Sequence, residues 1–73
     1  MDNKTLNNLR EDLVGELQAI NQYQKHIEET DNEEVKKILE HIRDDEKEHF
    51  AELTKLIRKL DEIQEEKFQK EEL

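Results

Sequence analysis

Apolar residues recur at alternating steps of three and four along most of this chain. One series runs over residues 6–27 and a second over residues 35–63. Such spacing places apolar side chains along one stripe of an α-helix and is typical of helices that pack against each other. Further apolar residues widen the stripes, as in a helix bundle rather than a two-stranded coiled coil. They are Leu17, Ile38, Phe50 and Ile57.

The segment 29–34, ETDNEE, is the one cluster of turn-forming residues between the two series. Asp31 or Asn32 can cap a following helix, and Glu34 lies three residues after Asp31, as in a capping box. The chain has no proline and one glycine, so little else interrupts helix. The pattern therefore predicts two long helices joined by a short turn.

These features predict an all-α fold in a single domain over residues 1–73. We expect the helices over about residues 4–29 and 33–70, with the turn at 30–32. A connection this short makes the two helices antiparallel neighbours. The predicted structure is a two-helix hairpin.

The predicted second helix is longer than the first by about a dozen residues. Leu60, Ile63 and Phe68 would then have no partner within the hairpin. Because a 73-residue chain without cysteine has few other means of stabilisation, we expect them to pack on another subunit.

Polar residues interrupt each apolar series at one level. Glu16 replaces an apolar residue in the first series, and Glu46 and His49 do so in the second. Glu16 lies about fifteen residues before the turn, and Glu46 and His49 lie about fifteen and eighteen residues after it. An unpaired buried carboxylate costs several kcal/mol, and neither series contains a lysine or arginine. The pattern predicts a polar layer inside the interface that needs a partner.

The spacing of Glu46 and His49 points to a metal. Residues three apart place a carboxylate and an imidazole on the same side of a helix. Di-iron helix bundles combine two such Glu-x-x-His motifs with one Glu from each of two further helices. This chain holds half of that set, so two chains would supply four Glu and two His for two metals. Four carboxylates balance two divalent ions, and oxygen-rich ligation suits iron or manganese, with zinc as a competitor.

A second interpretation belongs to a different functional class. The polar layer could set the register of a non-catalytic helical oligomerisation module, as buried polar groups do in some helix assemblies. In that case leucine at positions 16, 46 and 49 would stabilise the assembly and abolish no activity. The metal hypothesis predicts loss of metal binding instead.

Composition narrows the range of partners. The net charge of −9 argues against a nucleic-acid partner, because phosphate binding requires a basic surface. No apolar run approaches the roughly 20 residues of a membrane span. The first residues lack the apolar core of a signal peptide. We therefore expect a cytoplasmic protein without a membrane partner.

The segment LVGELQAINQYQKHIEETDNEEVKKILEHIRDDEKEHFAEL, residues 13–53, resembles the encapsulated ferritins, two-helix relatives of ferritin and rubrerythrin. The pattern of that family is a Glu followed seven residues later by Tyr, a turn of the TDDEEL kind, and then ILxHxRDEEKEH. The block ILEHIRDDEKEH follows this pattern almost throughout. The resemblance implies a hairpin that completes a ferritin-like four-helix bundle by dimerisation.

The resemblance also implies a function and its residues. It implies a ferroxidase that oxidises Fe(II) to Fe(III) with dioxygen at a di-iron centre shared between two chains. Glu16, Glu46 and His49 occupy the ligand positions, with Glu46 as the bridging and Glu16 as the terminal carboxylate. Tyr23 occupies a neighbouring aromatic position. Rubrerythrin-like peroxide reduction is an alternative, although the cysteines of the electron-transfer module common in those relatives are missing here.

Partners follow from the same resemblance. It implies a homo-oligomer built from dimers, a ring such as a decamer, and residence within an encapsulin nanocompartment that stores the iron. Gly15 and Gln18 stand where such proteins often carry acidic residues that attract iron, and Gln22 where a Trp is common. These departures concern a secondary iron-access site and not the ligand positions. No recognisable encapsulin-docking tail follows KFQKEEL.

Further residues allow two interpretations each. Tyr23 continues the apolar series, so packing competes with a role in tuning the metal. His41 and Asp45 are four residues apart and favour a surface pair over an outer metal ligand. Gly15 and Ala19 form a strip of small residues one turn apart. Because Gly inside a helix costs about 1 kcal/mol relative to Ala, we expect this strip to contact another subunit beside Glu16.

Overall fold

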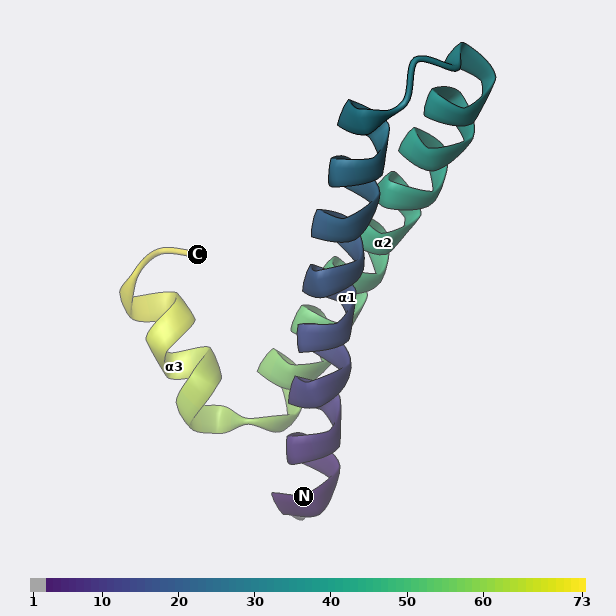
Figure 1. Ribbon diagram of the computed structural model, residues 1–73. Coiled ribbons are helices and arrows are strands. Elements are labelled where there is room, and N and C mark those ends of the chain that lie inside the picture. Colours follow the sequence, from purple (N-terminus) through teal and green to yellow (C-terminus); the bar gives the residue numbers. More distant parts are fainter. Residues whose placement is uncertain (1–2) are drawn as a thin grey trace.

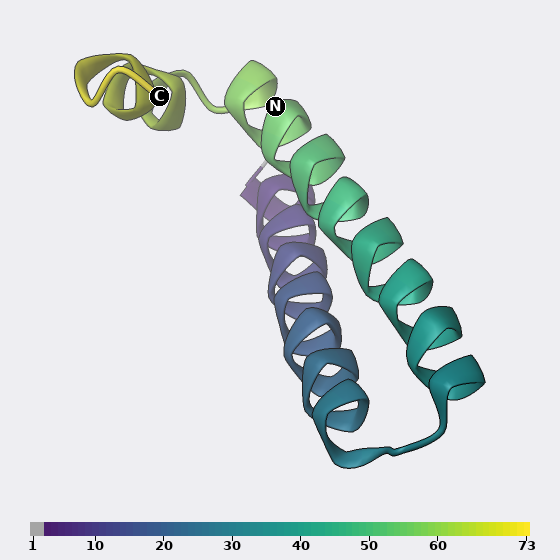
Figure 2. The ribbon, with the colours of Figure 1, turned by 90° about the horizontal axis from the view of Figure 1, so that it is seen from above.

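The computed structural model describes residues 3–73, which form three helices and no strand. They are α1 (Asn3–Glu29), α2 (Glu33–Leu60) and α3 (Glu62–Lys70). Helices α1 and α2 form an antiparallel hairpin, and α3 leaves the end of α2 at a sharp angle (Figure 1, Figure 2). The prediction of an all-α fold is confirmed. Met1 and Asp2 of the predicted domain lie outside the described residues.

The turn at 30–32 lies where the sequence placed it, and Asn32 rather than Asp31 caps α2. The Asn32 side-chain oxygen accepts a hydrogen bond from the backbone N–H of Val35 at 3.1 Å. This bond satisfies one of the N–H groups that have no partner within the helix. Glu33 and Glu34 add negative charge at the positive end of the helix dipole. These local interactions explain why α2 begins at Glu33.

Replacing Asn32 with alanine is expected to lower the free energy of unfolding by about 1 kcal/mol, because it removes the cap. Asn32→Asp keeps an acceptor oxygen at the same place and should unfold close to wild type. Urea unfolding followed by circular dichroism measures both differences. Equal losses in the two variants would argue against a capping role.

The predicted continuous helix over 33–70 is wrong, because the chain breaks at Asp61. The Asp61 backbone N–H donates to the carbonyl of Ile57 at 2.8 Å, and its side chain accepts from the N–H of Gln64 at 3.1 Å. Its other carboxylate oxygen lies 2.6 Å from Nη2 of Arg10. Asp61 thus closes α2, caps α3 and ties the break to α1. The apolar pattern carries no sign of this break, since Arg10 is 51 residues away.

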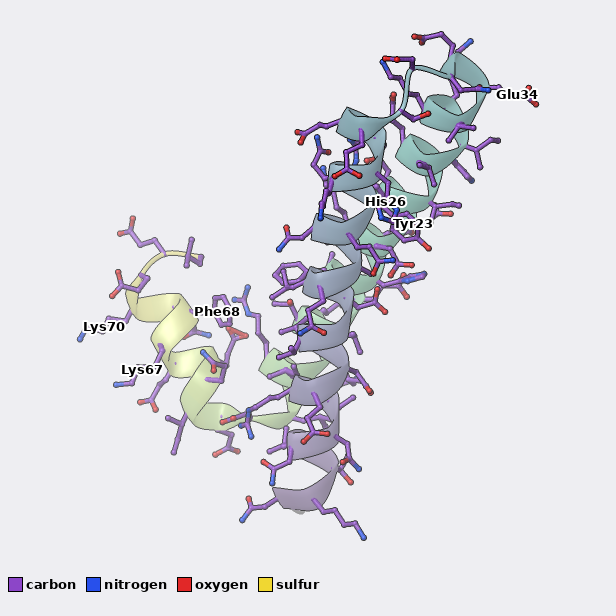
Figure 3. The ribbon with its side chains drawn as sticks, viewed as in Figure 1. Tyr23, His26, Glu34, Lys67, Phe68 and Lys70 are labelled. Atoms are coloured by element: carbon purple, nitrogen blue, oxygen red, sulfur yellow. The ribbon has the colours of Figure 1, made fainter. Side chains whose placement is uncertain are left out.

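Helix α3 folds back beside the hairpin. Phe68 points from α3 towards the hairpin, whereas Lys67 and Lys70 point away from it (Figure 3). The Arg58 guanidinium lies 4.4 Å from the centroid of the Phe68 ring, and it donates to Glu65 at 2.6 and 2.9 Å. Phe68 therefore has a partner within its own chain, contrary to the prediction. Ile63 is 68% exposed, so a contact with another subunit stays a prediction for that residue.

The interface between α1 and α2 is thin. Leu6, Ile27 and Ile57 are the buried apolar residues within residues 3–73. Seven large apolar side chains of that range remain exposed: Val14, Leu17, Val35, Ile38, Leu56, Ile63 and Leu73. A chain this small rarely stands alone with so little buried surface. No helix within the described range is both long and apolar enough to cross a membrane.

Beyond Glu46, the face of α2 that lies against α1 shifts from the predicted apolar series towards the apolar residues beside it. Phe50 is half-buried and Ile57 is 5% exposed, whereas Leu56, a member of the second apolar series, is 40% exposed. A straight helix turns by about 100° per residue, so a strict seven-residue repeat drifts by about 20° per repeat. Over this length the drift turns Phe50 and Ile57 inward. His49 is left at the edge of the interface.

Candidate metal centre

The hairpin brings Glu16, Glu46 and His49 together. One ligand atom from each residue lies within 4.8 Å of the others. Nδ1 of His49 is 3.4 Å from Oε2 of Glu16 and 3.5 Å from Oε2 of Glu46. Glu16 comes from the middle of α1, and the other two lie one turn apart on α2. The three side chains that interrupt the apolar series therefore meet at one level.

These side chains are not enclosed by the hairpin. The side chains of Glu16 and Glu46 are 23% and 21% exposed, and that of His49 is 50% exposed. The prediction of a layer inside the interface is therefore wrong for His49. Phe50 takes the inward position, and this places the imidazole beside it at the surface. The group of three is open on one side.

The two carboxylates and the imidazole influence one another's protonation. Hydrogen bonding with the Glu46 carboxyl is the largest cause of a raised pKa for Glu16, and desolvation and the charge of Glu46 add to it. Desolvation by itself lowers the pKa of His49, but the charges and hydrogen bonds of Glu16 and Glu46 outweigh it and raise that pKa above 6.5. The group therefore binds protons more readily than the same side chains would if they were isolated.

The donor set fits a divalent cation. At metal–ligand distances of about 2.1 Å, neighbouring ligands of one ion lie about 3.0–3.4 Å apart. The separations of 3.4 and 3.5 Å between His49 and the two carboxylates are close to this range. Oε2 of Glu16 is shielded from solvent and has no close hydrogen-bond partner besides the long 3.4 Å approach of Nδ1 of His49. Two carboxylates and one imidazole suit iron, manganese or zinc, but three ligands leave octahedral coordination incomplete.

An open cavity of about 560 Å³ adjoins the group. It is lined by Glu11, Asp12, Gly15, Glu16, His49, Glu52 and Leu53. The apolar spacing gave no indication of the acidic residues Glu11, Asp12 and Glu52. Helical spacing could have found two of them, since Asp12 lies four residues before Glu16 and Glu52 three residues after His49. Nothing lies within 4 Å of a Cβ built on Gly15, so packing within the chain does not require glycine there.

The other candidate residues lie outside the group. Tyr23 is half-buried on α1, seven residues from Glu16, and hence about 10 Å along the helix. Nε2 of His41 lies 3.5 Å from Oδ2 of Asp45, and these side chains are 76% and 52% exposed. This is the surface pair that the spacing favoured. A role for any of the three beside a metal stays a prediction.

Exposed apolar residues flank the group along α2. Ile38, His49 and Leu56 are separated by eleven and seven residues, which places them within about 20° of one stripe. Ile38 and Leu56 are 57% and 40% exposed. Shallow hollows adjoin both of them, one lined partly by Val35 and Leu39 and one by Leu53 and Lys59. Apolar surface on both sides of a polar group is typical of an interface with another chain.

Comparisons with known proteins place the chain in a family. The EncFtn-like family model matches residues 1–72. The encapsulin nanocompartment cargo protein EncC of Myxococcus xanthus (strain DK1622) is 45% identical over 60 residues, which are 82% of this chain. The chain spans about half of that relative, 46% of its length. No solved structure gives a significant match. The chain belongs to the EncFtn-like family, the encapsulated ferritins, as its resemblance to them predicted.

Proposed function

We propose that this protein is a ferroxidase, which oxidises Fe(II) to Fe(III) with dioxygen at a di-iron centre shared between two copies of the chain. The convergence of Glu16, Glu46 and His49 on an open face of the hairpin carries this proposal. Membership of the EncFtn-like family supports it. When bound, the two iron ions would supply the redox chemistry that passes electrons from Fe(II) to dioxygen.

Two copies are needed because one chain offers too few ligands. Each chain contributes two carboxylates, so a pair of chains supplies a charge of −4 against +4 for two divalent ions. An isologous two-fold contact would bring the same surface of each chain together. The stripe of Ile38, His49 and Leu56 would then be covered, and His49 would lose its exposure. The open space at Gly15 leaves room for the second chain beside Glu16.

Each ligand has a separate role in this proposal. Glu46 would be the carboxylate shared by the two metals. Glu16 and His49 would each bind a single metal ion. In the free protein the pKa of Glu16 is raised, chiefly by its hydrogen bond with Glu46, so protons compete with a cation for this carboxylate more than for an ordinary glutamate. The imidazole must likewise be neutral to offer a lone pair. Metal binding is thus coupled to proton release from the group.

We further propose that the protein acts as cargo within an encapsulin nanocompartment in the cytoplasm. The similarity to a cargo protein of M. xanthus supports this placement. Iron oxidised at the shared centre would then accumulate inside the shell. Dimers would associate further into a ring such as a decamer, with the remaining exposed apolar residues at their contacts.

The proposal is tested by measuring mass in solution and the oxidation of Fe(II) together. Native mass spectrometry without oxygen should show a monomer or a weak dimer in chelator, and dimers or multiples of them with Fe(II). After admission of air, Fe(II) should disappear faster than in buffer and oxygen should be consumed. A monomer indifferent to Fe(II) contradicts the proposal. Faster turnover with hydrogen peroxide than with oxygen would favour peroxide reduction instead.

A further inference from the structure

The break at Asp61 is imposed by contacts rather than by helix-breaking residues. Residues 58–70 contain neither proline nor glycine, and they are mostly good helix formers. Leu60 and Ile63 also continue the three–four spacing of α2 across the break. A straight helix would give the N–H groups of residues 62–64 partners in the preceding turn. An extended α2 is therefore an accessible alternative to the bent chain.

The contacts that hold α3 in the docked position are largely ionic. One is the pair between Arg10 and Asp61, whose side chains are 46% and 17% exposed. The other is the pair between Arg58 and Glu65, which are 28% and 30% exposed. Water and salt reach both pairs. Ion pairs at such positions weaken as ionic strength rises.

Packing beneath α3 is incomplete. A cavity of about 260 Å³ lies between α3 and the hairpin, lined by Arg10, Leu13, Phe50, Thr54, Ile57, Gln64 and Phe68. The Thr54 hydroxyl is shielded from solvent there without a hydrogen-bond partner. This cavity is partly open to solvent, so α3 does not close over the apolar residues of the hairpin, and few hydroxyls in protein interiors lack a partner. The docked helix is thus held without the close apolar packing that would fix it in place.

We propose that α3 is a hinged arm, which pivots at Asp61 between this docked position and a straight continuation of α2. The arm controls access to the apolar surface of Leu13, Phe50 and Ile57. Phe50 and Ile57 lie about 100° and 80° around α2 from His49, so α3 covers a different face of that helix from the one that carries the imidazole. The hinge is independent of the proposed ferroxidase. Salt, or a chain that binds the extended arm, shifts the balance between the two positions.

Spin labels on the full chain measure this equilibrium directly. The chain has no native cysteine, so Asn21→Cys and Gln69→Cys introduce two unique labels at exposed positions of α1 and α3. In the extended state residue 69 lies nine residues past Leu60, about 14 Å farther along the axis of α2. Double electron–electron resonance should resolve the two distances, with unlabelled protein and chelator present to suppress contacts between copies.

We expect mainly the short distance at about 0.01 M salt. At about 1 M salt, where the Debye length falls from about 30 to about 3 Å, the longer distance should rise at least about threefold. Asp61→Ala removes both the cap and the ion pair, so it should give mainly the longer distance and a higher helix content. Asp61→Asn keeps the cap but loses the pair with Arg10, so it should show partial release and a smaller salt response, which comes from the remaining Arg58–Glu65 pair. One unchanged distance across salt and variants, or a broad distribution without added helix, overturns the hinge.

Discussion

Glu46→Gln is expected to slow the oxidation of Fe(II) by at least about 100-fold, to the rate in buffer alone. The substitution replaces one carboxylate oxygen with an amide nitrogen and removes one negative charge, while the side-chain shape is kept. Two chains then offer −2 instead of −4 to two divalent ions. The amide also cannot bridge two metals through two anionic oxygens. Stopped-flow absorbance and oxygen consumption measure the loss.

Two matched substitutions separate this effect from a general change of charge. Glu40→Gln makes the same replacement on α2, six residues before Glu46, at an exposed position. His41→Gln serves in the same way as a control for a substitution of the His49 imidazole, because His41 forms an exposed pair with Asp45. We expect the two controls to oxidise iron within about twofold of wild type, as surface substitutions outside a site usually leave function intact.

The outcome decides between functional classes. A Glu46→Gln variant that oxidises Fe(II) at the wild-type rate would remove the centre from the mechanism, whatever the oligomeric state. A loss in both Glu46→Gln and Glu40→Gln would indicate that overall acidity, rather than ligation, attracts the iron. Only a loss confined to the three ligand positions supports a shared di-iron centre.

Local patterns predicted the hairpin and the meeting of its polar residues. The extent of the first helix and the position of the turn follow from the apolar spacing and from Asn32, which act between residues close together in the sequence. Glu16 and Glu46 are about equally many residues away from the turn. They therefore lie at the same height along the hairpin, because both helices rise by the same distance per residue. Side chains 30 residues apart in sequence could thus be placed together without a structure.

Two features of the structure depend on packing contacts that the spacing of apolar residues does not predict. His49 and Phe50 are adjacent, and either could face inward by the three–four pattern. The drift of a straight helix favours Phe50, so the imidazole lies at the open edge. The break at Asp61 depends on Arg10, which approaches only after the hairpin has formed. In both cases a distant contact overrides the helical pattern.

The variant with Glu16→Leu, Glu46→Leu and His49→Leu is expected to melt at a higher temperature than wild type in metal-free buffer. In wild type the hydrogen bond with Glu46, desolvation and the charge of Glu46 together raise the pKa of Glu16, which shows that its ionised form is disfavoured beside Glu46. Leucine removes the ionised groups and extends the apolar stripe of each helix. With Mn²⁺ at about 100 times its Kd, wild type should gain about 2.7 kcal/mol by linkage, or a Tm increase of about 10 °C or more. The Tm of the variant should not respond to Mn²⁺.

The response to metal, rather than the stability itself, separates the two interpretations of the polar layer. A layer that only sets register also predicts that leucine stabilises the chain, but it predicts no response to Mn²⁺ in wild type. Glu28→Leu, Glu40→Leu and His41→Leu together make the same changes of residue type on the same helices, at exposed positions. This control should keep the full Mn²⁺ response. If wild type and both variants melt at temperatures that Mn²⁺ does not change, the carboxylates and imidazole are kept for helix pairing and the ferroxidase proposal fails.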